Sequence, residues 1–151
     1  MNRLARLVAT SFYTGFFPFA PGTVGAFGAL LFAWIFPGLL GLPLLLITIV
    51  IFFLGVWAAT EVEKTDGHDA SIINIDEVVG MWISLLFLPA GLSWYWFVIA
   101  FLIFRFFDIV KPPPVNQSQN LAKGWGVMVD DVMAGIYSNL LLRLLLYFIV
   151  R

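Results

Sequence analysis

The sequence predicts an all-α, polytopic transmembrane helix bundle of about four to five helices, some of them short or broken. Hydrophobic residues make up 62% of the chain and charged residues 11%, and the mean hydropathy is +0.99. A soluble domain has about half apolar and a quarter charged residues. Residues 7–60 contain no Asp, Glu, Lys, Arg or His, and all nine carboxylates fall in residues 61–77 and 108–131. The length of 151 residues allows a single integral-membrane domain, residues 1–151.

Charge and cysteine content exclude several classes of protein. The net charge of −1 argues against nucleic acid as a partner. The lack of cysteine excludes disulfides, thiolate metal sites and cysteine nucleophiles. Residues 1–6 and the apolar run behind them resemble the start of a signal peptide, but the run is too long and lacks a small-residue cleavage pattern. We therefore expect this segment to belong to the mature chain.

The N-terminal part divides into two predicted helices, because a membrane span needs roughly 20 apolar residues. Pro-Gly and Gly-Leu-Pro within residues 37–43 form a turn signal that breaks any helix crossing it. We expect one helix around residues 23–36 and another around 43–63. The turn before the first helix, residues 18–25, includes Thr23, which could cap the helix while free N–H groups bind an anion.

Residues 78–104 can form either one kinked span or a tight helical hairpin. Pro89-Ala90-Gly91 favours a turn, and Ser93-Trp94-Tyr95-Trp96 resembles an interfacial aromatic belt. The hairpin brings both acidic segments to one face of the membrane, whereas a single span separates them by about 30 Å of hydrocarbon. We therefore predict the hairpin, followed by a last helix from about residue 131 to 150.

The basic residues predict which side of the membrane carries the acidic segments. The turns at residues 37–43 and 89–93 are uncharged, and most basic residues share the acidic side. Those are Arg3, Arg6, Lys64, Arg105, Lys111 and Lys123. By the positive-inside rule, this side and its polar site face the cytoplasm. Arg143 does not fit, since it lies over halfway along the last helix, and it either snorkels or faces the bundle interior near Asn139.

Two acidic pairs, Asp76-Glu77 and Asp130-Asp131, stand directly against apolar runs and are followed by Gly80 and Gly135. We expect each pair to open a helix, where acids favour the positive end of the dipole and the glycines allow close helix approach. Capping explains one carboxylate of each pair but not two, because adjacent acids repel unless a positive charge lies between them. A hard cation with oxygen ligands, such as Mg²⁺, would supply that charge.

Arg105, Asp108 and Lys111 recur every three residues and therefore share one face of a helix end. A surface ion pair at the water boundary would explain them. Beside two acidic pairs they instead suggest phosphate, since Mg²⁺ and cations together neutralise a phosphoryl group and the charge that develops on it. Pro112 and the two prolines after it stop the helix.

The remaining polar residues have simpler expected roles. Glu61 and Glu63 are read as polar loop residues between helices, and the single histidine, His68, as an exposed loop residue rather than a ligand or base. Residues 123–126, Lys-Gly-Trp-Gly, could form a flexible loop near the site or a plain connector.

Four segments, in this order over roughly residues 10–135, together resemble one protein family. They are Ala20-Pro21-Gly22-Thr23-Val24-Gly25, Ile75-Asp76-Glu77-Val78-Val79-Gly80, Arg105-Phe106-Phe107-Asp108-Ile109-Val110-Lys111-Pro112 and Gly124-Trp125-Gly126-Val127-Met128-Val129-Asp130-Asp131-Val132-Met133-Ala134-Gly135. With them the chain resembles the phosphatidylglycerophosphatase A family. It departs from the family pattern at Ser11 and Tyr13, where glycines are usual, and at Ala26, where a serine is usual.

The resemblance implies a multi-pass enzyme of the bacterial inner (cytoplasmic) membrane with its active site facing the cytoplasm. Such an enzyme is an Mg²⁺-dependent lipid phosphatase that removes the terminal phosphate of phosphatidylglycerophosphate to leave phosphatidylglycerol. The sequence has no cysteine, no Asp-x-Asp pattern and no second histidine, so cysteinyl-, aspartyl- and histidyl-phosphate routes fit poorly. Metal-assisted attack of water remains, with one carboxylate as base.

On this interpretation the catalytic group comprises Asp76, Glu77, Asp108, Asp130 and Asp131. Metal binding falls first to Glu77 and Asp131 and then to Asp76 and Asp130, with Asp108 as ligand or base. Arg105 and Lys111 hold phosphate oxygens, and Thr23 adds a hydrogen bond. The alternatives are another Mg²⁺-dependent membrane phosphotransferase, a small cation transporter, which would place its carboxylates near the midplane, and a lipid-binding subunit. The sequence indicates neither an oligomeric partner nor the number of metal ions.

Overall fold

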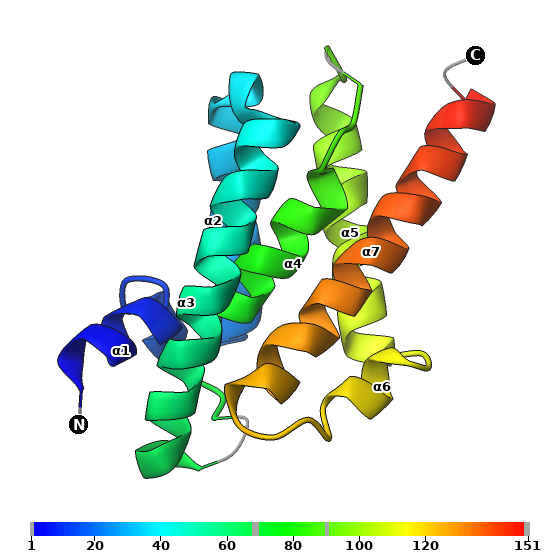
Figure 1. The fold of residues 1–151 in the computed structure, drawn as a ribbon. Coiled ribbons are helices and arrows are strands. Elements are labelled where there is room, and N and C mark those ends of the chain that lie inside the picture. The colour runs from blue at the N-terminus through cyan, green and yellow to red at the C-terminus, as the bar shows by residue number, and fades with distance from the viewer. Residues whose placement is uncertain (1, 68–69, 90, 150–151) are drawn as a thin grey trace.

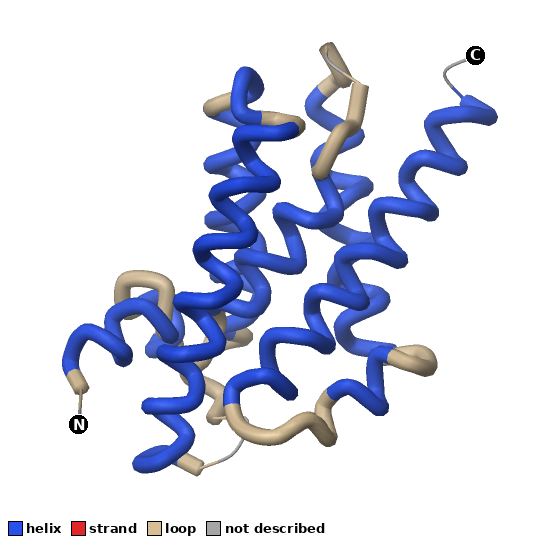
Figure 2. Tube along the Cα trace, in the orientation of Figure 1, coloured by secondary structure: helices blue, strands red, loops and turns tan. Residues whose placement is uncertain are grey.

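The computed structural model describes residues 2–67, 70–89 and 91–149, and within these ranges helices are joined by loops and turns and there is no strand (Figures 1 and 2). The elements are α1 (Arg3–Ala9), the 3₁₀ helix η1 (Thr14–Phe16), α2 (Pro21–Ile35), the 3₁₀ helix η2 (Pro37–Leu39), α3 (Leu42–Asp66), α4 (Ile75–Leu85), α5 (Trp94–Val110), α6 (Val115–Ser118) and α7 (Gly124–Ile149). His68 and Asp69 lie outside the described residues, so the expectation for His68 stays a prediction.

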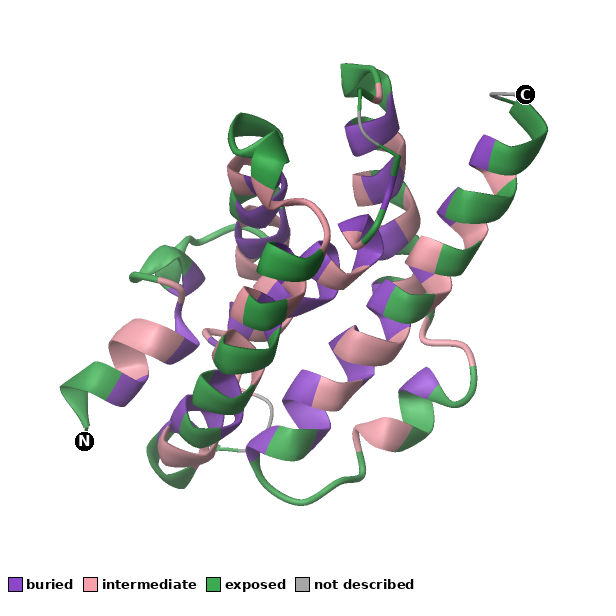
Figure 3. Cartoon of the chain, turned by 45° about the horizontal axis from the view of Figure 1, so that its top comes forward, coloured by how far each residue is buried: buried purple, intermediate pink, exposed green. Residues whose placement is uncertain are grey.

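The long helices run side by side and the chain reverses at the two ends of the bundle (Figure 1). Helix α4 lies at the centre and packs against α2, α3, α5 and α7. Figure 3 shows buried residues concentrated along α4 and on the side of α7 that faces it. Although α2 and α3 are joined by a short turn, they do not form a major helix pair within the described residues.

The predicted hairpin in residues 78–104 is confirmed, since α4 ends at Leu85 and α5 starts at Trp94 and runs back (Figure 1). Two helices, α3 and α7, are long and apolar enough to cross a membrane, while α2 is apolar but shorter. Helix α4 has 11 residues, or about 16 Å of helix, roughly half of the hydrocarbon thickness. A count of four to five spanning helices therefore stays a prediction, whereas the all-helical class is confirmed.

Two predicted helix starts were wrong. Helix α2 begins at Pro21 with Ala20 as its N-cap, so Thr23 lies inside the first turn and does not cap the helix. Helix α7 begins at Gly124, well before residue 131, so the acidic pair on α7 does not open the helix. The residues after Lys123 are helical and not a loop.

Tight packing explains why α7 starts at Gly124. The glycines there allow α7 to lie close to α3 and to the segment before α7, and they do not form a flexible loop. A Cβ atom on Gly124 would lie 2.5 Å from the carbonyl oxygen of Val56, and one on Gly126 would lie 2.7 Å from that of Gln119. Contact with α3 and with the segment before α7 thus compensates for the low helix propensity of glycine.

The close approach of α4 and α7 predicted from Gly80 and Gly135 is confirmed. A Cβ atom on Gly80 would lie 2.7 Å from the carbonyl oxygen of Asp131, and one on Gly135 would lie 2.5 Å from the carbonyl oxygen of Gly80. Any larger residue would force the helices apart. This contact brings the acidic pair of α7 beside the first turn of α4.

The C-terminal end of α4 is closed by two polar residues of α7. The side-chain amide of Asn139 donates to the carbonyl oxygens of Ile83, Ser84 and Leu86 at 3.2, 3.0 and 2.9 Å. Arg143 donates to Asn139 at 2.8 Å and to the carbonyls of Leu86 and Phe87 at 3.0 and 2.9 Å. Arg143 contacts Asn139, as one of the two alternatives predicted, but it is exposed and does not lie in the bundle interior. These bonds satisfy carbonyls that a helix end otherwise leaves without donors.

Candidate metal and phosphate site

Five carboxylates from three helices meet near one end of the bundle. Asp76 and Glu77 lie in the first turn of α4, as predicted, while Asp108 lies in the last turn of α5 and Asp130 and Asp131 lie in the second turn of α7. Carboxylate oxygens of Glu77, Asp108 and Asp131 lie within 4.8 Å of one another. Asp76 interacts electrostatically with its neighbour Glu77 and with Asp130 and Asp108. The hairpin of α4 and α5 is what brings these acids together.

The acidic cluster is buried and is not a solvated loop. The relative exposure is 9% for Glu77, 7% for Asp108, 3% for Asp130 and 2% for Asp131. A carboxylate removed from water is costly unless it is paired, hydrogen-bonded or bound to a metal. By contrast, Glu61 and Glu63 lie outside this cluster. The prediction that they are loop residues was wrong, because both lie in the last turns of α3, where Glu61 pairs with Lys64.

Two cations lie among these acids. Arg105 forms an ion pair with Glu77 and another with Asp108, the second at 2.7 Å. Lys111 forms an ion pair with Asp130 and its Nζ lies 4.0 Å from Asp108 Oδ1. The predicted grouping of Arg105, Asp108 and Lys111 is therefore observed, but as a partly buried group that joins helices and not as a surface ion pair.

Lys111 follows the last residue of α5 in a left-handed conformation, with φ +46°. Burial of the ammonium disfavours its charged form, but the hydrogen bond to Asp130 and the neighbouring carboxylates outweigh this and raise the pKa of Lys111. The cation is thus held in its charged form beside the acidic cluster.

Two carboxylate oxygens of the cluster have no hydrogen-bond partner within the described part of the chain. These are Asp76 Oδ1 and Asp131 Oδ2, both buried. Among the described residues the five carboxyl groups meet two cations, so the cluster has more acidic than basic groups together with unsatisfied acceptors. Buried polar atoms of this kind call for a specific explanation. A divalent cation that prefers oxygen ligands, such as Mg²⁺, fits this donor set.

The geometry groups the candidate ligands differently from the sequence-based ranking. Glu77 and Asp131, ranked first, do lie together, and Asp108 completes the three-carboxylate group. Both oxygens of Asp130 are engaged, Oδ1 by the N–H of Asp131 at 3.0 Å and Oδ2 by Lys111. Asp76 lies beside the group and supplies an unpartnered oxygen. The division into ligands and base stays a prediction.

The Ala20–Gly25 segment at the start of α2 contacts the acidic cluster at Gly22. The sequence alone assigned no role in the site to this glycine. A Cβ atom on Gly22 would overlap Glu77 Oε1, so glycine here leaves room for the carboxylate in its present position. Thr23, in the next position, is half-buried and its side chain has no hydrogen bond to another described residue. Its predicted contact with phosphate stays a prediction.

Asn74 is a second residue that sequence reasoning missed. It is fully buried, and its amide nitrogen donates to Thr14 Oγ1 at 2.9 Å and to the carbonyl of Pro21 at 3.2 Å. These bonds tie the segment before α4 to the start of α2, and so hold Gly22 against Glu77. The available signal was a lone amide in an apolar stretch directly ahead of an acidic pair.

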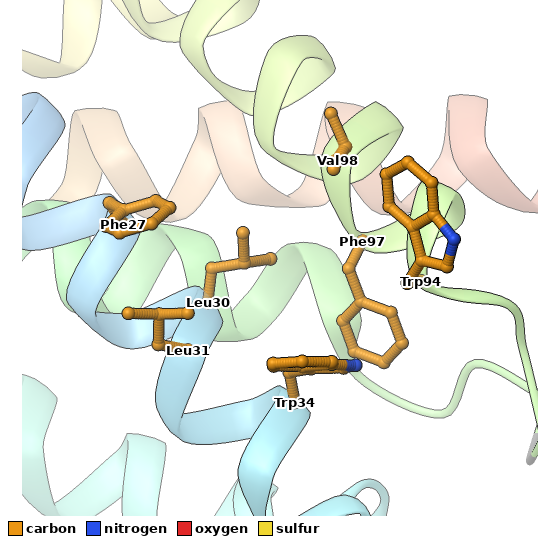
Figure 4. Close-up of a pocket in the computed structure, with 7 residues that line it drawn as sticks. All are labelled: Phe27, Leu30, Leu31, Trp34, Trp94, Phe97 and Val98. Carbon is orange, nitrogen blue, oxygen red and sulfur yellow. The ribbon is translucent and has the colours of Figure 1, made fainter.

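A separate hollow of about 170 Å³ between α2 and α5 has different chemistry (Figure 4). Its lining consists of Phe27, Leu30, Leu31, Trp34, Trp94, Phe97 and Val98. None of these residues carries a charge, so this hollow cannot hold a phosphoryl group or a metal ion. The acidic cluster is therefore the candidate site.

The family model described as phosphatidylglycerophosphatase A matches residues 7–146. The chain belongs to the phosphatidylglycerophosphatase A family. It is 38% identical to the phosphatidylglycerophosphatase A of Haemophilus influenzae over 95% of this chain and 90% of the relative. The corresponding Escherichia coli protein is 36% identical over 91% of this chain and 81% of the relative. No solved structure matches the chain significantly.

A third relative carries a different name. A Bacteroides thetaiotaomicron protein, provisionally named a phosphatidylinositol-3-phosphatase, is 47% identical over 90% of this chain and 89% of the relative. All three names describe phosphatases of membrane lipids. The predicted family and the predicted phosphatase class of enzyme are thus confirmed, and a cation transporter or a lipid-binding subunit is not supported.

Proposed function

We propose that this protein hydrolyses the terminal phosphomonoester of phosphatidylglycerophosphate, in a reaction that depends on Mg²⁺, to give phosphatidylglycerol and phosphate. The observation that carries the proposal is the buried group of Glu77, Asp108 and Asp131, with Arg105 paired to two of its members. In a member of this family, such a group provides both parts of a phosphomonoester site, a place for a divalent cation and positive charge for the phosphoryl oxygens.

Glu77, Asp108 and Asp131 would hold the metal ion. When bound, the ion supplies positive charge that balances the carboxylates, polarises a phosphoryl oxygen and makes a bound water more acidic. The protein contributes preorganisation, because ion pairs and glycine contacts hold these side chains in place before the substrate arrives. Gly22 and Arg105 limit where the Glu77 carboxylate can lie.

Arg105 and Lys111 bind the phosphoryl oxygens and stabilise the negative charge that grows on them as the bond to phosphorus breaks. Water attacks phosphorus, the phosphomonoester P–O bond breaks, and the departing glycerol oxygen takes up a proton. Asp76 Oδ1, which is buried and without a donor in the described residues, is available to accept the proton that water loses.

Phosphatidylinositol 3-phosphate is a second candidate substrate, favoured by the name of the relative that is 47% identical. Both lipids present a phosphomonoester on a glycerophospholipid head group, and the same cations and metal ligands would act on either. The head group between phosphomonoester and diacylglycerol differs, so a direct comparison of the two substrates decides between them.

The reaction is tested by phosphate release from the purified protein in mixed micelles, with each lipid in turn, in EDTA and after addition of Mg²⁺. We expect phosphatidylglycerophosphate to be hydrolysed with the higher kcat/KM, and activity to require added Mg²⁺. A higher kcat/KM for phosphatidylinositol 3-phosphate would show that this lipid is the substrate. Full activity in EDTA would refute the proposed dependence on Mg²⁺.

We further propose that the protein crosses the bacterial inner membrane several times with the acidic end in the cytoplasm. The positive-inside rule supports this, because most basic residues lie at the acidic end. Cysteines introduced at Ser71 and Asn120, in two loops at that end (Figure 1), can be labelled from either side of oriented vesicles. Both should react from the cytoplasmic side, and opposite accessibility would contradict the shared site.

A further inference from the structure

A second hollow, larger than that in Figure 4, lies between α1, α2, α3 and α4. It has a volume of about 520 Å³, within the usual range for sites that bind small molecules and far above the voids of a packed core. Its apolar walls include Leu7 of α1, Leu54 of α3 and Val78 of α4. We refer to it as the α2–α4 groove.

Gly28 leaves open space in the wall of the α2–α4 groove, whereas a Cβ atom on Gly25 would lie 2.8 Å from the carbonyl oxygen of Asn74. Gly25, Gly28 and Ala29 lie on one face of α2 and line the groove. A Cβ atom on Gly28 would meet nothing within 4 Å. This distinguishes Gly28 from Gly80, where neighbouring helices fill the space that glycine leaves. Gly28 therefore borders open space and is not required for close packing between helices.

Two aromatic rings line the end of the groove farther from α1. Phe32 and Trp82 line the groove, and their ring centroids lie 5.3 Å apart. The indole nitrogen of Trp82 donates to the carbonyl oxygen of Ala29 at 3.0 Å, which fixes the position of the ring. Between Gly25 and Phe32 the groove extends for about 10 Å along α2. This shape suits part of a linear apolar chain.

The other end of the groove adjoins the acidic site. Gly25 lies one helical turn after Gly22, the residue against which the Glu77 carboxylate lies. On α4, Ile75 and Val78 line the groove and flank Asp76 and Glu77 in sequence. The site and the groove therefore occupy different faces of the same first turns of α2 and α4.

Hydroxyl groups mark this end of the groove. Ser11 and Thr14 contribute to a lining that is otherwise apolar or aromatic. Ser11 Oγ is buried and has no hydrogen-bond partner within the described ranges. Such an atom can donate to the phosphodiester that links a lipid head group to its glycerol backbone.

We propose that the α2–α4 groove binds an acyl chain of the lipid whose phosphomonoester lies in the acidic site, so that the head group passes around the start of α2. This inference rests on the proposed function. Bulk lipid would contact the outer surface of the bundle, but the groove is lined by residues of four helices, has Phe32 and Trp82 at one end and adjoins the helix turns that carry the site. The hollow in Figure 4 shares no such turn with the acids.

The test is a series of substitutions at Gly28, namely Gly28→Ala, Gly28→Leu and Gly28→Trp. Each is assayed with dioleoyl phosphatidylglycerophosphate and with its water-soluble dihexanoyl analogue. We expect KM for the dioleoyl lipid to rise with the size of the side chain, by about tenfold or more for Leu and Trp. Values of kcat/KM for the dihexanoyl lipid should change less than about twofold, because short chains do not need the groove.

Matched controls add the same bulk elsewhere. Gly38→Leu fills open space in the turn between α2 and α3, and Val98→Phe fills the hollow of Figure 4. Neither should change the ratio of the two KM values. An equal loss with both lipids at Gly28, or no loss with either, would overturn the groove as an acyl-chain site. Wild-type protein inactive on both lipids would instead refute the proposed function.

A second measurement does not depend on turnover. A phosphatidylglycerophosphate with a photoreactive acyl chain should label peptides covering residues 24–32 and 75–82, and unlabelled phosphatidylglycerophosphate should compete whereas phosphatidylcholine should not. In Gly28→Trp this labelling should be lost. Uniform labelling of the lipid-facing surface, or cross-links to a second copy of the chain in this groove, would overturn the proposal.

Discussion

The two ends of α4 carry polar clusters of opposite kinds. At the first turn, Asp76 and Glu77 belong to a cluster that, within the described part of the chain, has more acids than cations and buried oxygens without a hydrogen-bond partner. At the last turn, Asn139 and Arg143 reach across from α7 and satisfy the terminal carbonyls. Both sets of residues stand out in the sequence as polar groups in apolar surroundings. In the structure, one set is complete and the other is not.

The difference indicates how polar residues with a role in function can be distinguished from those that stabilise the fold of a helix bundle. A polar contact in which every group has a partner stabilises the fold and leaves nothing for a ligand. A buried carboxylate with an unpartnered oxygen retains capacity for a cation or a proton. The comparison predicts that substitutions at the start of α4 abolish turnover and spare the fold, whereas substitutions at its end reduce stability and spare turnover.

The largest expected effect is on the three-carboxylate group. Asp131→Asn and Glu77→Gln should each lower kcat by about 10³-fold or more, because a metal ion contributes several kcal/mol to transition-state stabilisation. Melting temperatures should stay near that of the wild type. Glu61→Gln is the control and should keep normal activity. Asp131→Asn with full activity and unchanged Mg²⁺ dependence would refute the metal site.

The next effect is on the cations. Lys111→Met keeps the apolar stem but removes the charge, and should lower kcat/KM by about 10²-fold if Lys111 binds developing phosphoryl charge. Arg105→Met should have a similar or slightly smaller effect. If these ion pairs are only structural, removing one partner leaves a buried carboxylate unpaired, which should lower stability by about 3–5 kcal/mol and leave catalysis by the folded protein nearly unchanged. Steady-state kinetics in micelles, with a melting curve for each variant, distinguish the two outcomes.

A smaller loss is expected from a single methyl group at the site. Gly22→Ala places a Cβ atom where Glu77 Oε1 now lies, so the carboxylate must move and kcat should fall by about 10- to 100-fold. Gly38→Ala adds the same methyl group in open space and should leave kcat unchanged. Equal activity of both variants would show that the position of Glu77 is not critical.

The smallest effect on turnover is expected at the other end of α4. Asn139→Leu leaves carbonyls of α4 without donors and should destabilise the protein by about 2–3 kcal/mol. Ser138→Ala removes a hydroxyl bonded within its own helix, at 2.7 Å from the Ala134 carbonyl, and should cost less than about 1 kcal/mol. Unfolding in detergent measures both. A large fall in kcat for Asn139→Leu at temperatures where it is folded would contradict the comparison.

The sequence by itself determined the features that depend on chain neighbours. Hydropathy located the helices, and proline and glycine at residues 37–43 and 89–91 located the chain reversals. Helices and turns follow from local preferences, so these expectations held to within a few residues at most ends. The same patterning sorted the acids to one end of the bundle, because charged residues are excluded from long apolar helices.

Only the tertiary structure decided which groups meet. Gly124 starts α7 early because it fits against α3, and Gly22 belongs to the site because it leaves room for Glu77. Asp108 rather than Asp130 joins Glu77 and Asp131, since Asp130 is held by Lys111. These contacts join residues that are far apart in the chain. Their choice depends on the distances between helices, which local sequence preferences do not specify.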